Sequence, residues 1–226
     1  MTDSPLAAFH PVVRAWFAEK FPTGPTAPQE AAWPEIPRGR DVLVASPTGS
    51  GKTLTAFLVA INEMWVNPPA EKLLGPRVVY LSPLRALATD VQQNLLQPLA
   101  ELKALGERMG YAAPDIRVDV RTGDTSSSER ASQKRRPAHI YVTTPETFYL
   151  LLTTKHGRTM MRQVETIIID EIHTMCRDKR GSHLTLSLER LERLCSESSR
   201  PRPQRIGLSA TQRPLDLVAS MLSGVG

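Results

Sequence analysis

Residues 42–53 read VLVASPTGSGKT, and this stretch decides the fold. A short apolar run ends in a glycine-rich turn, and helical spacing begins at Lys52. The turn matches the pattern GxxxxGK followed by Ser or Thr, except that Ser46 replaces the first glycine. Its glycines let backbone N–H groups converge on phosphate oxygens at a helix N-terminus. We therefore expect phosphate contacts from Thr48, Gly49, Ser50, Gly51, Lys52 and Thr53, with Lys52 pairing with the β- and γ-phosphates and Thr53 ligating Mg²⁺.

Outward from this loop, short apolar runs alternate with helical stretches. We expect strands at 42–45, 77–81, 118–121, 140–143, 166–169 and 206–208. We expect helices at 12–20, 52–65, 84–109, 184–194 and 215–222, the third of them interrupted near Pro98. Such alternation is typical of βαβ units and a parallel sheet, and unbroken apolar strands indicate that both faces are covered. The sequence predicts an α/β fold with a parallel sheet flanked by helices.

A second polar cluster, Asp170-Glu171-Ile172-His173, directly follows the apolar run 166–169. A carboxylate at the carboxyl end of a buried parallel strand lies at the ligand edge of the sheet. We expect Asp170 to hold Mg²⁺ and Glu171 to orient and polarise an attacking water, both as catalytic groups together with Lys52. The alternative is an ordinary helix cap, and the upstream phosphate loop favours the catalytic role. His173 is expected to relay between the γ-phosphate site and the rest of the protein rather than to ligate a metal.

A third cluster, Ser209-Ala210-Thr211, also follows a predicted strand. Short hydroxyl side chains at that place can hydrogen-bond across to the Asp-Glu turn, which would make Ser209 and Thr211 coupling residues. The tripeptide alone has almost no specificity. Its order and spacing after the other two clusters give it weight.

Composition narrows the class of protein. Hydrophobic residues make up 41% of the 226 residues and charged residues 23%, as in a globular protein. The net charge of +5 is compatible with a polyanionic partner and equally with a solvated mixed-charge surface. Two cysteines form neither a disulfide framework nor a metal cluster. No apolar run approaches the roughly 20 residues of a membrane span, and the N-terminus lacks a signal-peptide pattern, so we expect a cytoplasmic protein without a membrane partner.

Together, the three clusters resemble motifs I, II and III of superfamily 2 helicases. The resemblance extends to the large helicase-related (Lhr) family, which is similar in the DEIH form at 170–173 and in the segments SPLRALA at 82–88, RTGDT at 121–125, TTPE at 143–146, KRG at 179–181 and GLSATQRPL at 207–215. It covers about residues 21–222. It implies a RecA-like P-loop NTPase domain at 41–226, preceded by an N-terminal helix and a Q-motif-like segment at 1–40, with ATP and Mg²⁺ as cofactors. It also implies that the strand carrying Ser209 lies between the strands that carry the P-loop and Asp170.

The resemblance assigns further residues. The segment GPTAPQ at 24–29 is similar to a Q motif, so Gln29 is expected to read the adenine edge with one donor and one acceptor. Motifs Ia, Ib and the TPxE element correspond to positions where hydroxyls and backbone N–H groups hold phosphates of a single strand without reading sequence. The expected nucleic-acid contacts are Ser82, Arg85, Thr122, Gly123 and Thr144. For Arg85 an exposed helix residue is the alternative, and for the two threonines a cap or turn, which is compatible with both roles.

The resemblance also implies what this chain lacks. Motifs IV to VI, with an arginine finger, belong to a second RecA-like domain, and a winged helix follows in the family. Because arginine fingers contribute roughly 10³- to 10⁵-fold in rate, we expect this chain to bind ATP but to hydrolyse it poorly. The implied parent activity is ATP-dependent 3′ to 5′ translocation on single-stranded DNA, with unwinding of DNA or RNA–DNA duplexes in DNA repair.

Two rival functions remain open at this point. The chain could be a nucleotide-dependent nucleic-acid-binding module that never turns over, which ATP-dependent DNA affinity without hydrolysis would favour. It could instead belong to an RNA helicase or a restriction translocase, which competition between DNA and RNA for the intact protein would decide. A kinase or GTPase is disfavoured, because no guanine-reading Asn-Lys-x-Asp occurs.

Overall fold

The computed structural model describes residues 5–47, 49–70, 74–176, 178–211 and 214–224, the side chains of residues 85–87 and 89 aside. Within these residues, six parallel strands form one sheet in the order β1-β6-β5-β2-β4-β3. The strands are β1 (Val42–Ala45), β2 (Val78–Leu81), β3 (Val118–Arg121), β4 (Ile140–Thr143), β5 (Thr166–Ile169) and β6 (Gln204–Ser209). The predicted parallel sheet is confirmed, and so is the place of β6 between β1 and β5.

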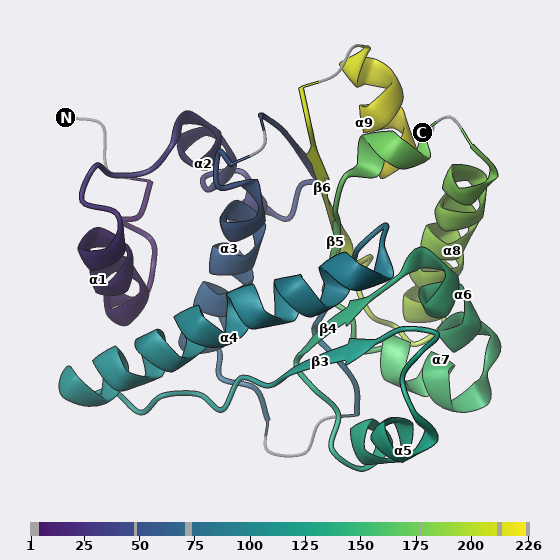
Figure 1. Ribbon diagram of the computed structural model, residues 1–226, viewed down its shortest axis with the longest axis horizontal. Helices are drawn as coiled ribbons and strands as arrows, with labels where there is room; N and C mark the ends of the chain where they lie inside the picture. Colours follow the sequence, from purple (N-terminus) through teal and green to yellow (C-terminus); the bar gives the residue numbers. More distant parts are fainter. Residues whose placement is uncertain (1–4, 48, 71–73, 177, 212–213, 225–226) are drawn as a thin grey trace.

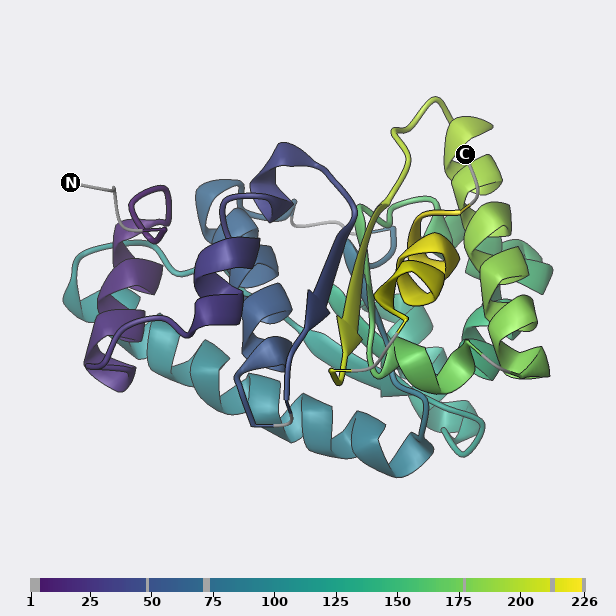
Figure 2. The same cartoon turned by 90° about the horizontal axis from the view of Figure 1, so that it is seen from above.

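Helices cover both faces of the sheet (Figure 1). One face carries α1 (Pro11–Lys20), α2 (Ala27–Ala32), α3 (Lys52–Val66) and α4 (Arg85–Arg108). The other face carries α6 (Pro145–Thr153), α7 (Lys155–Met161), α8 (Lys179–Ser196) and α9 (Leu215–Ser223). The short helix α5 (Ser127–Arg135) follows the edge strand β3, and two 3₁₀ turns are η1 (Ile36–Arg38) and η2 (Ile172–Met175). Viewed from above, the sheet separates the two helical layers (Figure 2).

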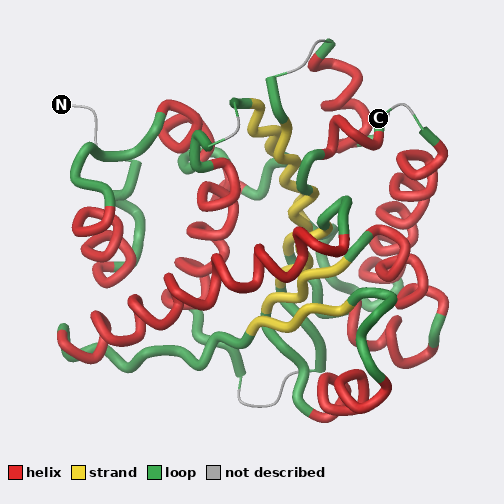
Figure 3. The backbone as a smooth tube through the Cα atoms, viewed as in Figure 1, coloured by secondary structure: helices red, strands yellow, loops and turns green. Residues whose placement is uncertain are grey.

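Alternation along the strands divides the core in two. Side chains of Val78 and Tyr80 pack with the α1–α4 layer, whereas those of Val79 and Leu81 pack with the α6–α9 layer. Successive strand residues point to opposite faces, so a strand buried on both sides is apolar throughout. The strands form a single band between the helices (Figure 3).

The helix α4 departs from expectation, because it runs through Pro98 without a break. Proline removes one backbone hydrogen bond, which usually kinks a helix. Here buried Leu95, Leu102 and Leu105 anchor the helix to the core on both sides of the proline. The expected interruption near Pro98 was therefore wrong.

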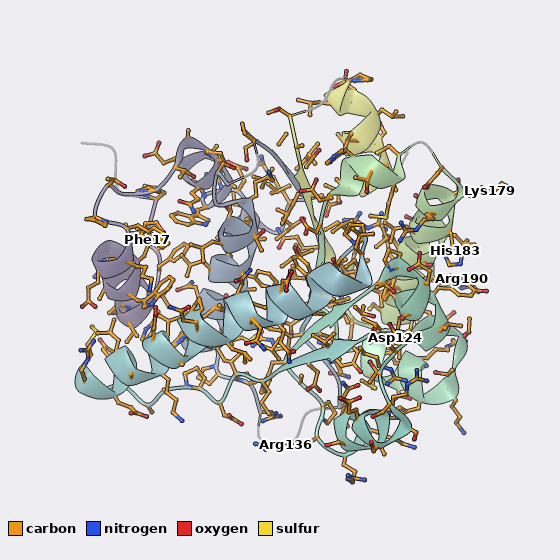
Figure 4. All side chains as sticks on the ribbon, in the orientation of Figure 1. Phe17, Asp124, Arg136, Lys179, His183 and Arg190 are labelled. Atoms are coloured by element: carbon orange, nitrogen blue, oxygen red, sulfur yellow. The ribbon has the colours of Figure 1, made fainter. Side chains whose placement is uncertain are left out.

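Side-chain contacts fasten the outer helices. The indole N–H of Trp16 and the ammonium of Lys20 each donate to the Glu101 carboxylate at 2.8 Å, which ties α1 to α4. On the opposite layer, His183 and Arg190 lie along α8 (Figure 4). Both contact the Tyr149 ring of α6: the His183 ring centroid lies 4.3 Å and the Arg190 Cζ 5.3 Å from the centroid of that ring. The expected helix at 184–194 proved longer at both ends, and α2, α5, α6 and α7 were not predicted.

Candidate nucleotide site

The glycine-rich loop between β1 and α3 has the backbone that its sequence predicts. Gly49 and Gly51 have φ of +81° and +82°, a left-handed conformation that glycine adopts without strain. Gly51 caps α3, whose first residue is Lys52. Thr48 lies outside the described residues. The loop thus places backbone N–H groups and a helix N-terminus where an anionic ligand is favoured.

Lys52 is buried, and its ammonium is held by carbonyl oxygens. Lys52 Nζ donates to the carbonyls of Ser46 at 2.6 Å and Pro47 at 2.9 Å. These are neutral acceptors, so an anionic phosphate would be a stronger partner. Ser46, the departure from the motif, is itself buried, with its hydroxyl 2.6 Å from that of Ser50 and its N–H donating to Ser209. A serine therefore fits at the first position of the loop.

The Q-motif-like segment lies directly against this loop. Thr26 donates its hydroxyl to the carbonyl of Ser50 at 3.1 Å. Gln29 is buried, and its Oε1 accepts from the Thr26 N–H at 2.9 Å. A Cβ added to Gly51 would lie 2.9 Å from Gln29 Nε2. The expected nucleotide contact Gln29 is thus packed under the phosphate loop.

The expected metal ligand Asp170 follows β5 at the same edge of the sheet. Its Oδ1 accepts from the Glu171 N–H at 3.0 Å. Burial raises the pKa of Asp170, and the Tyr80 hydroxyl and Lys52 offset this in part by lowering it. Glu171 has φ of +46°, in the left-handed region that non-glycine residues rarely adopt. Such strain is typical of functional turns.

The sequence did not single out Tyr80, although its hydroxyl lies beside Asp170 and Thr53. Tyr80 is fully buried on β2, and burial together with Asp170 raises its pKa well above the ordinary value. Sequence analysis included this residue only as part of the expected strand at 77–81. The signal that could have identified it is general: a buried tyrosine hydroxyl usually needs a partner.

His173 joins the Asp-Glu turn to the third cluster. The Ala210 N–H donates to His173 Nδ1 at 3.3 Å, and Ser209 Oγ lies 3.2 Å from the same nitrogen. Because a backbone N–H can only donate, Nδ1 is the acceptor and the proton of the neutral ring is on Nε2. That nitrogen lies 3.4 Å from Glu171 Oε2. A continuous polar contact therefore runs from Glu171 through His173 to Ser209.

Thr211, the other expected coupling residue, does not take part in this contact. It is exposed, and its hydroxyl forms no hydrogen bond with another described residue. Ser209, by contrast, is fully buried, and its hydroxyl lies 2.8 Å from the carbonyl of Ala210 and 3.2 Å from His173 Nδ1, two acceptors that share its single proton. In this conformation Ser209 and the Ala210 backbone contact His173, and Thr211 does not.

The phosphate loop and the Asp-Glu turn line one cavity of about 560 Å³, which continues between α3 and α4. Its polar wall is formed by Gly49, Gly51, Lys52, Thr53, Tyr80, Asp170 and Glu171. A nucleoside triphosphate with a divalent cation fits this donor set. The loop supplies backbone donors, and the half-buried Asp170 carboxylate needs positive charge to offset its desolvation. Within the described residues, no cluster of three or more His, Cys, Asp or Glu side chains forms an all-protein metal site.

The expected nucleic-acid residues lie at the same sheet edge, but their hydroxyls have internal partners. Ser82 is fully buried and donates to the carbonyl of Leu84 at 3.0 Å. Thr122 Oγ1 accepts from the Asp124 N–H at 3.3 Å, and Thr144 caps α6 by accepting from the Thr147 N–H at 3.4 Å. The threonines are thus a turn residue and a cap.

Two further residues complete this group. Gly123 is exposed beside Thr122, and its carbonyl accepts from Arg130. Arg85 is the first residue of α4, and its side chain lies outside the described part. Sequence analysis quoted Arg180 within the segment KRG but gave it no role. Arg180 donates to Glu146 and to the carbonyl of Pro83, both at 2.8 Å, and so joins two of these turns.

A sequence model of the DEAD/DEAH box helicases matches residues 26–218. The chain belongs to the DEAD/DEAH box helicase family. It is 46% identical over 220 residues to the Lhr helicase/probable uracil glycosylase of Mycolicibacterium smegmatis, covering 97% of this chain and 14% of that protein. It is 47% identical over 213 residues to the ATP-dependent helicase Lhr-Core protein 2 of Thermococcus barophilus, covering 94% of this chain and 24% of that protein.

A solved structure agrees with these relatives. The structure of the Mycobacterium smegmatis helicase Lhr bound to ssDNA and AMP-PNP superposes with a TM-score of 0.89 at 45% identity, covering 98% of this chain and 27% of that one. The resemblance to Lhr helicases expected from the sequence is confirmed, and with it the RecA-like fold. The chain spans about a quarter or less of the length of these relatives. No helix in the described residues is long and apolar enough to cross a membrane.

Proposed function

We propose that this chain is the nucleotide-binding domain of a longer ATP-dependent helicase similar to the Lhr proteins. The observation that carries the proposal is the convergence of Lys52, Thr53, Asp170 and Glu171 on one cavity, with Glu171 connected through His173 to β6. An ATP-driven motor requires donors to the phosphates, carboxylates beside them and a contact that transmits conformational change. The parent activity is 3′ to 5′ translocation on single-stranded DNA, with unwinding of DNA or RNA–DNA duplexes in repair. The ssDNA and AMP-PNP bound by the mycobacterial relative support the nucleotide and the single strand as ligands.

Nucleotide binding follows from the phosphate loop. Lys52 exchanges the carbonyls of Ser46 and Pro47 for β- and γ-phosphate oxygens, while N–H groups of residues 48–53 hold the phosphates. Gln29 pairs with the adenine edge. Thr53 and Asp170 would hold Mg²⁺, which would supply positive charge to the phosphate oxygens.

Hydrolysis is assigned to Glu171. Its carboxylate accepts a hydrogen bond from a water and orients the water oxygen in line with the γ-phosphorus. The new P–O bond forms as the bond to the β–γ bridging oxygen breaks, giving ADP and phosphate, and the water proton is released. The Nε2–H of His173 holds the other side of the Glu171 carboxylate, so a change at the γ-phosphate reaches Ser209 on β6.

Nucleic acid is proposed to lie across the turns after β2, β3 and β4. The hydroxyls of Ser82, Thr122 and Thr144 order these turns, so the phosphate contacts come from exposed backbone N–H groups near Gly123 and the N-terminus of α6. Arg85 adds charge at the start of α4. Such contacts hold a strand without reading its sequence.

The domain division at residue 41 stays a prediction, as does dependence on a second RecA-like domain and a winged helix. Those parts would complete the cleft and supply the arginine finger, and opening and closing of the cleft would couple hydrolysis to movement. This chain alone should therefore bind ATP and turn it over poorly.

Steady-state ATPase assays of the 226-residue chain, with and without single-stranded DNA, test this proposal, with Lys52→Ala as background. We expect turnover near that background. Fluorescence anisotropy of labelled single strands, with DNA and RNA in competition, tests the partner. Rapid DNA-stimulated turnover by this chain alone would contradict its dependence on a second domain.

A further inference from the structure

The hydroxyl of Tyr80 has no role in the reaction above, yet it lies inside the site. Tyr80 is fully buried on the central strand β2. Its ring stacks on Phe57 of α3, with centroids 4.8 Å apart and an interplanar angle of 21°. The hydroxyl oxygen lies beside Asp170 and Thr53, but it makes no hydrogen bond of ordinary geometry with a described residue. Because buried polar groups normally have partners, this hydroxyl points to an interaction made when the site is filled.

The surroundings of the hydroxyl identify that interaction. Tyr80 lines the same cavity as Thr53 and Asp170, the two side chains assigned to the metal. The Asp170 carboxylate has one oxygen, Oδ1, engaged by the Glu171 N–H at 3.0 Å. An ionised carboxylate accepts several hydrogen bonds, whereas a neutral phenol can donate one. Tyr80 is therefore a donor placed beside a carboxylate with unused acceptor capacity.

We propose that Tyr80 is a positioning residue, whose hydroxyl donates to the Asp170 carboxylate and holds it facing Thr53 when nucleotide and metal bind. This inference rests on the proposed function, since it takes Asp170 and Thr53 as the metal-holding pair. The strand and the Phe57 ring fix the phenol, so the donor cannot move away with the turn that carries Asp170. Groups that orient a metal ligand in this way commonly change metal affinity about 10- to 100-fold when removed.

The direct test is Tyr80→Phe, which removes the hydroxyl and keeps the ring on Phe57. Affinity for a fluorescent ATP analogue is measured with Mg²⁺ and again in EDTA. We expect Mg²⁺ to strengthen binding in the wild type and this gain to fall about tenfold in the variant. Affinity in EDTA should stay within about twofold. Equal weakening in both conditions would overturn the proposal, because it would indicate a packing defect.

The matched control is Tyr141→Phe. Tyr141 is also fully buried, on β4, but its hydroxyl donates to Gln133 at 2.9 Å and does not line the cavity. This variant should show the wild-type gain from Mg²⁺. Thermal unfolding of both variants shows whether each is folded.

A double-mutant cycle with Asp170→Asn tests whether Tyr80 acts through Asp170. If it does, Tyr80→Phe has little further effect on the Mg²⁺ gain in the Asp170→Asn background. Additive effects would contradict that route. If Mg²⁺ did not change the nucleotide affinity of the wild type, the proposed function would be contradicted. Failure of the Tyr80 proposal and failure of the proposed function are therefore distinguishable.

Discussion

The carboxyl edge of the sheet has two halves that use polar side chains differently. In the nucleotide half, the segments after β1, β5 and β6, the Lys52 ammonium donates to two backbone carbonyls and the Asp170 carboxylate is partly desolvated. In the outer half, the segments after β2, β3 and β4, Thr122 and Thr144 bind their own backbone. The first half keeps binding capacity for a ligand, and the second uses it to order turns. Substitutions should accordingly change ligand affinity in the first half and stability in the second.

The largest expected effect on stability comes from a substitution in the nucleotide half. Gly51→Ala forces a Cβ to 2.9 Å from Gln29 Nε2 at a φ of +82°, and Gln29 is buried and bonded to Thr26. We expect a loss of roughly 2–4 kcal/mol in unfolding free energy, from left-handed strain and overpacking together. Nucleotide affinity should fall as well. Urea unfolding measures the first and fluorescent-nucleotide titration the second.

Gly110→Ala is the control for that experiment. Gly110 has a similar φ of +78°, but an added Cβ meets nothing within 4 Å. Only the strain of about 1–2 kcal/mol applies there, with no change in nucleotide affinity. Equal losses of unfolding free energy at both glycines would mean that the contact between Gly51 and the Q-motif-like segment does not limit the space for a side chain.

The second effect concerns pH and the opposite edge of the sheet, where the parallel strands begin. His139 immediately precedes β4, is buried, and accepts from the Arg117 N–H at 2.9 Å. Burial, with Arg117 nearby, lowers its pKa from 6.5 to about 4. Between these values the unfolded chain binds more protons, so stability is complete above about pH 6.5 and falls toward pH 4. The loss attributable to His139 is up to about 3 kcal/mol.

Urea unfolding at pH 7.5 and 5 checks this expectation. His139→Asn offers an acceptor to Arg117 without titrating, so its stability should depend less on pH than that of the wild type. Identical pH dependence in the two proteins would show that protonation of His139 does not cause the loss of stability.

A smaller effect tests directly whether a substitution in the outer half changes stability without changing nucleotide affinity. Thr144→Ala removes the cap of α6 and should cost about 1 kcal/mol in unfolding free energy while leaving nucleotide affinity unchanged. Thr154→Ala removes the equivalent cap of α7 and serves as control for cap loss at a site away from the proposed strand path. A drop in single-strand affinity specific to Thr144→Ala would show that this hydroxyl also serves the ligand, against the contrast drawn here.

The smallest effect is at Thr211. Its side chain is exposed, so Thr211→Ala should change unfolding free energy by no more than about 0.5 kcal/mol. Ser209→Ala, at a buried hydroxyl beside His173, should destabilise the protein more. A reversed order, measured by urea unfolding, would mean that Thr211 takes the coupling position.

Much of the fold could be predicted because the chemistry is local. The strands Val118–Arg121, Ile140–Thr143 and Thr166–Ile169 begin and end at the residues predicted for them. The helix α5 was missed because Ser127–Arg135 has almost no apolar residues and is defined instead by its capping box. The interruption at Pro98 was wrong because tertiary packing of α4 outweighed a local rule.

The site was predictable only in part, for a related reason. Glycine-rich turns and strand-ending carboxylates indicate where polar atoms lie, since their position follows from topology. Periodicity does not show whether a hydroxyl faces a ligand or its own backbone, as at Ser82 and Thr144. It also places Tyr80 in the core without showing that its hydroxyl faces Asp170.

The central claim is that the cavity around Lys52 binds MgATP, and calorimetry tests it most directly. The wild-type chain is titrated beside Lys52→Ala and beside Lys134→Ala, which removes an exposed ammonium on α5. We predict binding by the wild type and Lys134→Ala and none detectable by Lys52→Ala. If Lys52→Ala bound MgATP as the wild type does, the cavity would not be the nucleotide site.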